Sequence, residues 1–346
     1  MNDLNLDAAH PLQPYWDLAL AAVRGEALRM ALEWQLFSRL QQPASAADVA
    51  RQLQLDAEHT GLWLETLWSM ELLKRDAQTP ALYRNTPLAE RYLRAEAADY
   101  CGDAWVFRLQ GLGQFAGQLA QRVREGRQAP APGNSAATIE HWTAAARVQI
   151  AQEQRAVTVD LARRLMSRVP EFASARRLLD VGGGPGLVAI ALAGDNPLLH
   201  GEVFDFAPTV AVAAENIRAA GLEQRLGVRA GDLATDPIGE GYDLIWCSSV
   251  LHFMPDLEAT LRKVHGALRP GGVLVSAHAE IPLQACAAQR VMPYYLAMQM
   301  QGRRVTRAGE LREALARNGF GTFDEYPGVS FAVAPVTVLV ARREAP

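Results

Sequence analysis

Two acidic residues flank a run of glycines in the second half of the chain, and their spacing indicates a nucleotide-type ligand. Asp180 ends an apolar run and is followed by Gly182, Gly184 and Gly186. Glycine lacks a Cβ, so such a turn can adopt positive φ and lie against a ligand. A helix is expected to start at Pro185, a residue that suits a first helical turn. Asp205 ends the next apolar run, where a carboxylate can bind the hydroxyl groups of a ribose.

The glycine spacing argues against a nicotinamide dinucleotide. The dinucleotide fingerprint is G-x-G-x-x-G, whereas Leu187 stands here at the position of the last glycine. A nicotinamide dehydrogenase is therefore disfavoured. A plain tight turn in an α/β domain is the alternative, and it leaves Asp205 unexplained.

Further candidates follow later apolar runs. Asp232 could accept a hydrogen bond from an adenine amine, with Leu233 packed on the ring, although Gly-Asp is also a common turn pair. Ser248 ends the fourth run, and His252 comes shortly after it. A neutral histidine can take a proton from a hydroxyl group at neutral pH. The alternative for His252 is a core or helix-capping histidine.

The elements that must position these residues alternate between short apolar runs and helical patterns, which is typical of a parallel α/β sheet. We expect strands at 178–181, 202–206, 227–230, 242–248, 273–278, 322–326 and 336–340, and helices at 185–193, 208–220, 256–268 and 308–318. Ligands of such sheets bind beyond the carboxyl ends of the strands, where all the candidates fall.

The first part of the chain has the order helix, helix, short β-wing, which is typical of a winged helix. Ser45, Asp56 and Thr86 are the expected helix N-caps. Residues 27–40 are apolar nearly all round, which indicates burial on several sides and a dimer interface. No Lys or Arg occurs from 52 to 73, so this module is predicted to dimerise and a DNA-binding regulator is disfavoured. A helical connector should follow over 98–169, with a loop at 127–134.

Composition restricts the class of protein further. The 346 residues are 49% hydrophobic and carry a net charge of −4, which favours a protein with a large core and no nucleic-acid or membrane partner. Its three cysteines are scattered, so neither a disulfide framework nor a metal site is expected. With no apolar segment near the acidic N-terminus, no signal peptide and a cytoplasmic location are predicted.

The order of these motifs resembles a known family. It comprises the winged-helix-like module, the connector, Leu-Asp-Val-Gly-Gly-Gly-Pro-Gly, Val-Phe-Asp, Gly-Asp-Leu, Val-Leu-His, Leu-Arg-Pro-Gly-Gly and a terminal hairpin. The chain is similar over 14–342 to the class I S-adenosylmethionine (SAM)-dependent O-methyltransferases of small aromatic molecules, of the plant caffeate and hydroxyindole type and the bacterial natural-product type. The resemblance implies a Rossmann-like α/β sheet behind an N-terminal, mostly helical dimerisation domain. The implied domains are 1–97 for dimerisation, 98–170 for the connector and 171–346 for SAM binding.

The resemblance also implies roles for individual residues. The protein would be a homodimer that converts SAM to S-adenosyl-L-homocysteine (SAH) while methylating a small metabolite, with His252 as general base. The implied cofactor residues are Asp180, Gly182, Gly184, Asp205, Phe206, Asp232, Leu233 and Ser248.

Two departures concern the support of His252. Many members read His-Asp-Trp where this chain reads His252-Phe253-Met254. Plant members orient the histidine with a glutamate at the end of the fifth strand, where this chain has His278, with Glu280 two residues further on. Either residue is a candidate to replace that glutamate.

The acceptor pocket is expected to be lined by the connector and by the helix after the fifth strand, although each candidate suits a plain core equally well. The candidates are Trp105, Phe107, Trp142, Met292, Tyr295, Met298 and Gln299. The loop at 302–306 is interpreted as structural, with Thr306 as a helix N-cap. The acceptor itself, the choice among O-, N-, S- and C-methylation, and a SAM-binding relative that no longer methylates all stay open.

Overall fold

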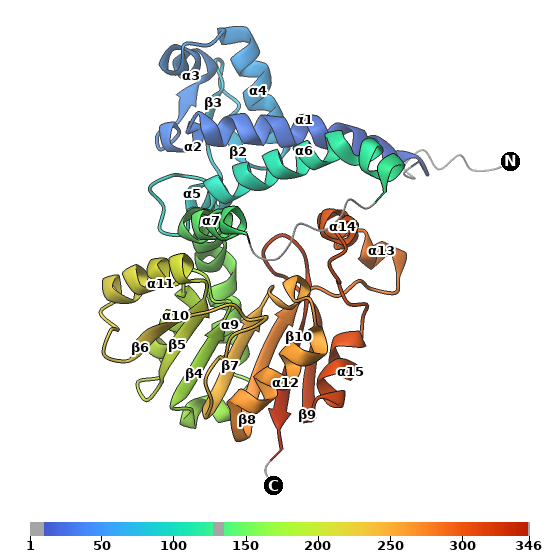
Figure 1. Cartoon of the computed structure of the whole chain (residues 1–346). Coiled ribbons are helices and arrows are strands. Elements are labelled where there is room, and N and C mark those ends of the chain that lie inside the picture. Colours follow the sequence, from blue (N-terminus) through green and yellow to red (C-terminus); the bar gives the residue numbers. More distant parts are fainter. Residues whose placement is uncertain (1–9, 127–134, 345–346) are drawn as a thin grey trace, which may run out of the picture. The chain divides into compact units, whose positions relative to one another are not determined.

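The computed structural model describes residues 10–126 and 135–344. The predicted absence of a signal peptide and the predicted loop at 127–134 therefore lie outside the described residues. The chain divides into two compact units, 1–111 and 112–346 (Figure 1). The predicted boundaries at 97 and 170 remain predictions.

The first unit has the element order of a winged helix. Its elements are α1 (Gln13–Glu33), α2 (Leu36–Arg39), β1 (Ala44–Ser45), α3 (Ala46–Leu53), α4 (Ala57–Ser69), β2 (Leu73–Arg75), β3 (Leu82–Asn85) and α5 (Pro87–Tyr92), followed by the start of α6 (Gly102–Glu125). The strands form an antiparallel sheet in the order β1-β3-β2. All three predicted N-caps are confirmed, because Ser45, Asp56 and Thr86 each accept a backbone N–H three residues on.

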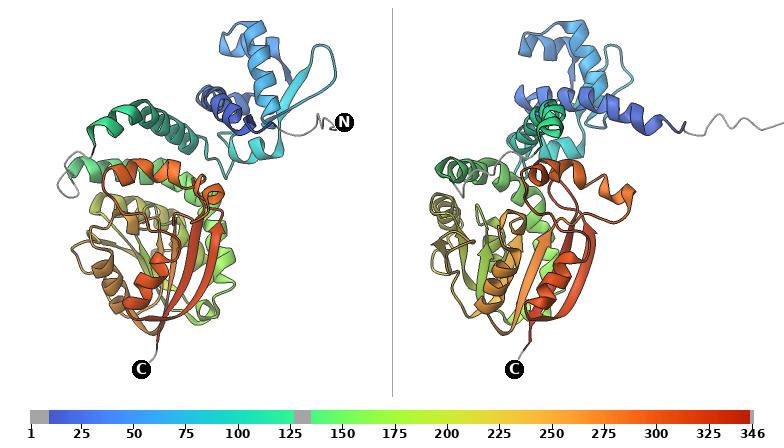
Figure 2. Two further views of the ribbon diagram at one scale, coloured as in Figure 1. Left: turned by 90° about the vertical axis from the view of Figure 1, so that its right-hand side faces the viewer. Right: turned by 45° about the vertical axis from the view of Figure 1, so that its right-hand side comes forward.

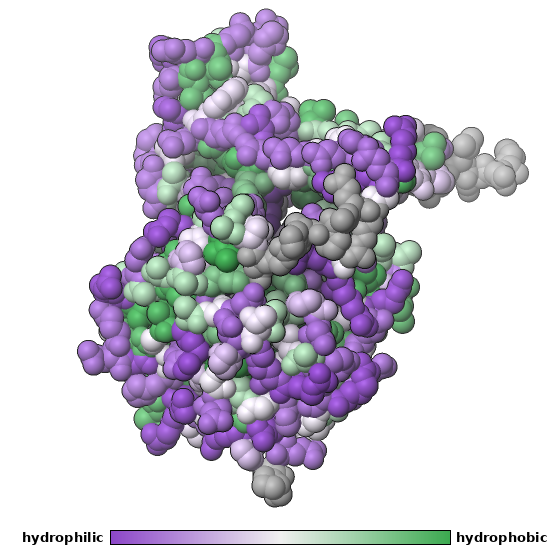
Figure 3. Space-filling model, viewed as in Figure 1, coloured by the Kyte–Doolittle hydropathy of each residue, from purple (hydrophilic) through white to green (hydrophobic). Residues whose placement is uncertain are grey.

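Helix α1 is buried at one end and exposed at the other. Ala27 and Ala31 of α1 and Leu36 and Phe37 of α2 are buried in the core of this unit, as predicted for the apolar residues of 27–40. The first half of α1 instead exposes large apolar side chains, and Figure 3 shows hydrophobic residues along this helix. Tyr15, Leu18 and Val23 are 68%, 72% and 63% exposed.

The second unit is built on a seven-stranded sheet in the order β6-β5-β4-β7-β8-β10-β9. The strands are β4 (Arg177–Val181), β5 (His200–Asp205), β6 (Leu226–Ala230), β7 (Tyr242–Ser248), β8 (Leu268–His278), β9 (Phe320–Val329) and β10 (Val336–Arg343). The first five are mutually parallel, and β10 runs antiparallel to both of its neighbours. Strand β8 starts five residues before the predicted position, because Leu268 already pairs with Tyr242 of β7, and a register shift separates this pair from the regular pairing that begins at Val273.

Helices cover both faces of this sheet (Figures 1 and 2). One face carries α9 (Val159–Met166), α10 (Leu187–Asp195) and α11 (Ala207–Ala219), and the other carries α12 (Leu257–Ala267) and α15 (Glu310–Arg317). A hydrophobic core lies on each face of the sheet, and successive strand residues point into alternate cores. Leu178 packs on the first face and Leu179 on the second.

The remaining helices lead into and out of the sheet. A continuous helical segment consists of α7 (Ala136–Ala145), the π-helical η1 (Ala146–Ile150), α8 (Ala151–Glu153), the π-helical η2 (Gln154–Thr158) and α9. The 3₁₀ turn η3 (Pro170–Ser174) precedes β4, and η4 (Leu251–Phe253) follows β7. Helices α13 (Ala285–Ala288) and α14 (Met292–Met300) lie between β8 and α15. Of the described helices, none combines the length and the apolar character needed to cross a membrane.

Candidate active site

The glycine turn after β4 has the left-handed backbone that its sequence predicts. Gly182, Gly184 and Gly186 have φ of 65°, 58° and 74°. A Cβ on Gly182 would lie 2.7 Å from a methyl group of Val250, so a larger residue would displace the loop after β7. The helix begins at Leu187, and the prediction of Pro185 as its start is wrong. Gly186 is its N-cap, and the left-handed φ of that residue cannot continue into an α-helix.

Gln154, which the sequence analysis did not identify, forms hydrogen bonds with this turn. The Gln154 side chain donates to the Gly183 carbonyl at 3.1 Å and accepts the Leu187 N–H at 3.1 Å. It is 8% exposed and opens the π-helical segment η2. Gln154 therefore joins the turn to the start of α10 with both ends of one amide.

Asp205 lies at the carboxyl end of β5, as expected, and also contacts the turn. Its two carboxylate oxygens accept the N–H groups of Gly184 at 2.9 Å and of Phe206 at 2.8 Å. Burial raises its pKa to about 6, against the opposing effect of these two bonds. Because a carboxylate can accept about four hydrogen bonds, Asp205 retains the capacity to bind ligand hydroxyls.

Asp180 lies beneath the turn and is 1% exposed. It accepts a backbone N–H from Ala189, while Oδ2 has no hydrogen-bond partner among the residues that the structure describes. Burial, and to a smaller extent the charge of Asp205, raises its pKa to about 7. A buried acceptor atom without a donor suits a ligand that brings a donor or a cation.

The other predicted cofactor residues follow neighbouring strands. Asp232 accepts the Ala234 N–H at 2.9 Å. This bond is typical of a turn aspartate, which was the alternative to adenine binding. Leu233 is buried in the core, and its carbonyl accepts the Lys263 ammonium at 2.7 Å. Ser248 accepts the Trp246 indole N–H at 3.1 Å. Their roles toward a cofactor stay predictions.

His252 lies in η4, directly after the loop that follows β7, and is 9% exposed. Its ring centroid lies 4.2 Å from that of Phe253 and 5.4 Å from that of Tyr295. Burial, reinforced by the positive charge of Arg303, lowers its pKa to about 4. His252 is therefore neutral at physiological pH and able to accept a proton.

His278 hydrogen-bonds with the backbone of the loop that carries His252. Its Nε2 accepts the N–H groups of Val250 and Leu251, both at 3.1 Å, which fixes the loop that carries His252. Its Nδ1 lies 2.9 Å from the Ser276 hydroxyl, so both ring nitrogens are engaged. No hydrogen bond between the two histidine rings occurs among the described residues.

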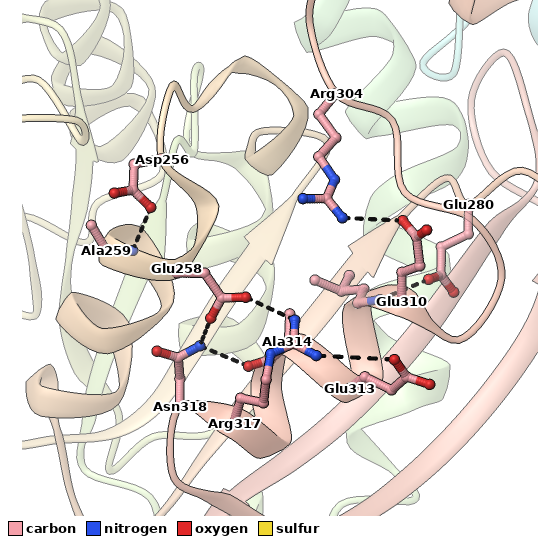
Figure 4. A network of polar contacts seen from close by, with 11 residues as sticks. Asp256, Glu258, Ala259, Glu280, Arg304, Glu310, Glu313, Ala314, Arg317 and Asn318 are labelled. Atoms are coloured by element: carbon pink, nitrogen blue, oxygen red, sulfur yellow. Dashed lines mark hydrogen bonds and ion pairs between the residues drawn. The ribbon is translucent and has the colours of Figure 1, made fainter.

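Glu280, the other candidate to support His252, bonds with the start of α15 in this structure, and its role toward His252 stays a prediction. Its carboxylate, drawn in Figure 4, accepts the Leu311 N–H at 3.1 Å. It also bonds with Thr337 and the backbone of Gly309. It therefore caps the N-terminus of α15, whose N-cap residue Gly309 has no side chain to do so. The prediction that Thr306 caps this helix is wrong, because α15 starts at Glu310 and its N-cap is Gly309.

Part of the predicted acceptor pocket comes together around Phe253. The Trp142 and Phe253 rings meet edge to face with centroids 4.9 Å apart, and Tyr295 approaches His252 in the same way. The other candidates of the second unit lie on α14 with Tyr295, where Met292 is exposed and Met298 and Gln299 are partly buried. Trp105 and Phe107 belong to the first unit.

The doubly wound sheet, the glycine turn and the acids at the strand ends define a SAM-dependent methyltransferase, and the comparisons agree. Residues 117–321 match the model of the O-methyltransferase domain, and 16–95 match that of the O-methyltransferase dimerisation domain. The chain belongs to this O-methyltransferase family, and SAM is its cofactor.

Named relatives act on different atoms. The chain is 30% identical to the N,N-dimethyltransferase OxyT of Streptomyces rimosus over 75% of each chain. It is also 30% identical to the 3-hydroxy-5-methyl-1-naphthoate 3-O-methyltransferase of Streptomyces sahachiroi, over 68% of this chain and 67% of the relative. The crystal structure of human N-acetylserotonin methyltransferase has the same fold, with a TM-score of 0.76 and 21% identity over 99% of this chain and all of that one.

Proposed function

We propose that this methyltransferase methylates a hydroxyl group of a small aromatic metabolite in secondary metabolism, with the acceptor beside His252. The observation that carries the proposal is a buried, neutral histidine whose ring contacts Phe253 and Tyr295, with Trp142 packed in turn on Phe253. The relatives named for naphthoate and for acetylserotonin methylation also act on aromatic hydroxyl groups. Because OxyT is named as an N,N-dimethyltransferase, an aromatic amine is the second candidate acceptor.

The residues around the glycine turn fit SAM by their chemistry. Bound SAM supplies an electrophilic methyl group on a positively charged sulfur. The turn would lie against the cofactor, Asp205 would accept hydrogen bonds from its ribose, and Asp232 and Leu233 would lie near its adenine. Asp180 has a buried oxygen without a donor and a raised pKa, so a nearby cation would favour its ionised form.

His252 would take the proton of the acceptor. With a pKa of about 4 it is a weak base, whereas an ordinary phenol has a pKa of about 10. A complete proton transfer from such a phenol would cost about 8 kcal/mol, so it is expected to accompany methyl transfer rather than precede it. An acceptor that ionises more easily would lower this cost.

The exposed apolar half of α1 would form a homodimer interface. Contiguous apolar surface that a single chain leaves exposed marks interaction sites, and this helix lies within the matched dimerisation domain, apart from its first three residues.

A transfer assay tests the proposed function. Methyl-labelled SAM is incubated with a metabolite extract and with native protein, His252→Ala, or the control His200→Ala, whose ring is exposed at the start of β5. We expect one labelled aromatic product that only His252→Ala loses. Label that survives this variant would refute the role of His252 as base, and no label despite SAM binding would favour a relative that no longer methylates.

A further inference from the structure

Arg303 follows α14 in a loop that the sequence indicated to be structural, yet its side chain reaches the His252 segment. Its backbone N–H donates to the Met298 carbonyl at 3.0 Å, which anchors the loop to α14. The guanidinium carbon lies 4.9 Å from the centroid of the Phe253 ring, and Nη1 donates to the Phe253 carbonyl at 3.4 Å.

This cation is partly buried without a counter-ion. Within residues 10–126 and 135–344, the contacts of the guanidinium are the ring and the carbonyl of Phe253, and no carboxylate forms an ion pair with it. Its neighbour Arg304, by contrast, pairs with Glu310 at 3.4 Å (Figure 4). Desolvation lowers the pKa of Arg303, so partial burial disfavours its charged form.

The surroundings of the guanidinium are those of the acceptor. The Phe253 ring that it covers also contacts Trp142 and His252, and His252 contacts Tyr295. This part of the site therefore combines aromatic rings with the Arg303 guanidinium, whose one hydrogen bond among the described residues goes to the Phe253 carbonyl. A guanidinium presents its donors in a planar fork that matches a carboxylate, often through two parallel hydrogen bonds.

We propose that Arg303 binds a carboxylate on the methyl acceptor, so that the substrate class is an aromatic hydroxy acid. The inference rests on the proposed placement of the acceptor beside His252. The carboxylate supplies the counter-ion that the chain lacks, and the aromatic side chains hold the ring. Arg303 is thus a specificity-determining residue for the transfer reaction.

Matched ligands test the assignment directly. Binding of hydroxynaphthoic acids and of their primary amides to the enzyme–SAH complex is measured by calorimetry, with native protein, Arg303→Gln, Arg303→Lys and Arg304→Gln. Each Gln variant removes one positive charge, and Arg304 serves as the exposed control. SAH affinity is measured for every variant to show that the cofactor site is intact.

We expect the acids to bind native protein and Arg304→Gln at least about tenfold more tightly than the amides. Arg303→Gln should lose this preference with unchanged SAH affinity, and Arg303→Lys should retain part of it. Equal binding of acid and amide, a preference that survives Arg303→Gln, or no acid binding at millimolar concentration would each overturn the inference. The transfer assay with labelled SAM tests the proposed function separately. A labelled aromatic product without a carboxylate would refute the role of Arg303 but would leave the proposed methyl transfer intact.

Discussion

Replacing Asp180 with Asn should stabilise the protein without ligand and weaken its binding of SAH. The native carboxyl has a pKa of about 7, against the usual value of 3.8 for an aspartate. The folded state therefore binds more protons than the unfolded state between these pH values, so Asp180 lowers stability progressively as pH rises through this window. Above pH 7 the penalty is about 4 kcal/mol, because each pKa unit corresponds to about 1.4 kcal/mol.

The variant should recover only part of this free energy. Asn keeps an oxygen for the Ala189 N–H, but its amide nitrogen takes the place of the carboxyl oxygen that has no partner among the described residues. A buried N–H without an acceptor costs about 1–3 kcal/mol, which leaves a net gain of about 2 kcal/mol at pH 8. The gain should shrink as pH is lowered toward 4, because the native carboxyl stays protonated while a growing share of the unfolded carboxyls becomes protonated, and most of the penalty is then gone.

Thermal unfolding from pH 4 to pH 8 measures this dependence, and calorimetry at pH 8 measures SAH affinity. Asp195→Asn is the matched control, since Asp195 is partly exposed and pairs with Arg163 at 2.9 Å. We expect a melting-temperature difference that grows with pH for Asp180→Asn alone, together with at least about tenfold weaker SAH binding. A difference that is independent of pH, or one that falls with rising pH, would refute the assignment of a raised pKa to Asp180.

Four further predictions follow from the described contacts. Gln154→Met should weaken SAH binding by about tenfold in calorimetry, because both hydrogen bonds to the glycine turn are lost. Leu18→Asp should convert the proposed homodimer to a monomer in light scattering, because it places a charge on the exposed apolar half of α1. Glu280→Ala should lower the free energy of unfolding in denaturant titrations by about 1 kcal/mol through loss of the α15 cap, with kcat/KM nearly unchanged. The acid limb of the kcat/KM profile should lie near pH 4, where His252 becomes protonated, and Arg303→Gln should shift it to higher pH.

Features that depend on local sequence were predictable. The three N-caps of the first unit need only a side-chain oxygen and the next turn of helix, and all three formed as predicted. The strand before the glycines and the acid at the carboxyl end of β5 were also placed correctly, because an apolar run that ends in a polar residue is compatible with few other structures. The start of α10 was missed by two residues because the φ of Gly186 is set by the whole turn.

Features that depend on distant contacts were not predictable. Gln154 meets Gly183 across 29 positions of sequence, and a π-helical segment begins at that glutamine, which no periodic pattern indicated. Glu280 and His278 were singled out as possible partners of His252, yet their bonds go to α15 and to the loop after β7. The sequence pattern predicts the strand or loop that carries each of these residues. It does not predict which distant residue each side chain hydrogen-bonds with.

The low pKa of His252 is consistent with the presence of Phe253 where many family members have an aspartate. Many members of the family have an aspartate beside the histidine, and a carboxylate there would favour the imidazolium form. This chain places an aromatic ring at that position and a guanidinium over the ring, so both changes disfavour a positive charge on His252. The same cation favours negative charge on anything bound beside it. Proton removal then depends less on the strength of the base than on an acceptor that already carries, or easily develops, negative charge.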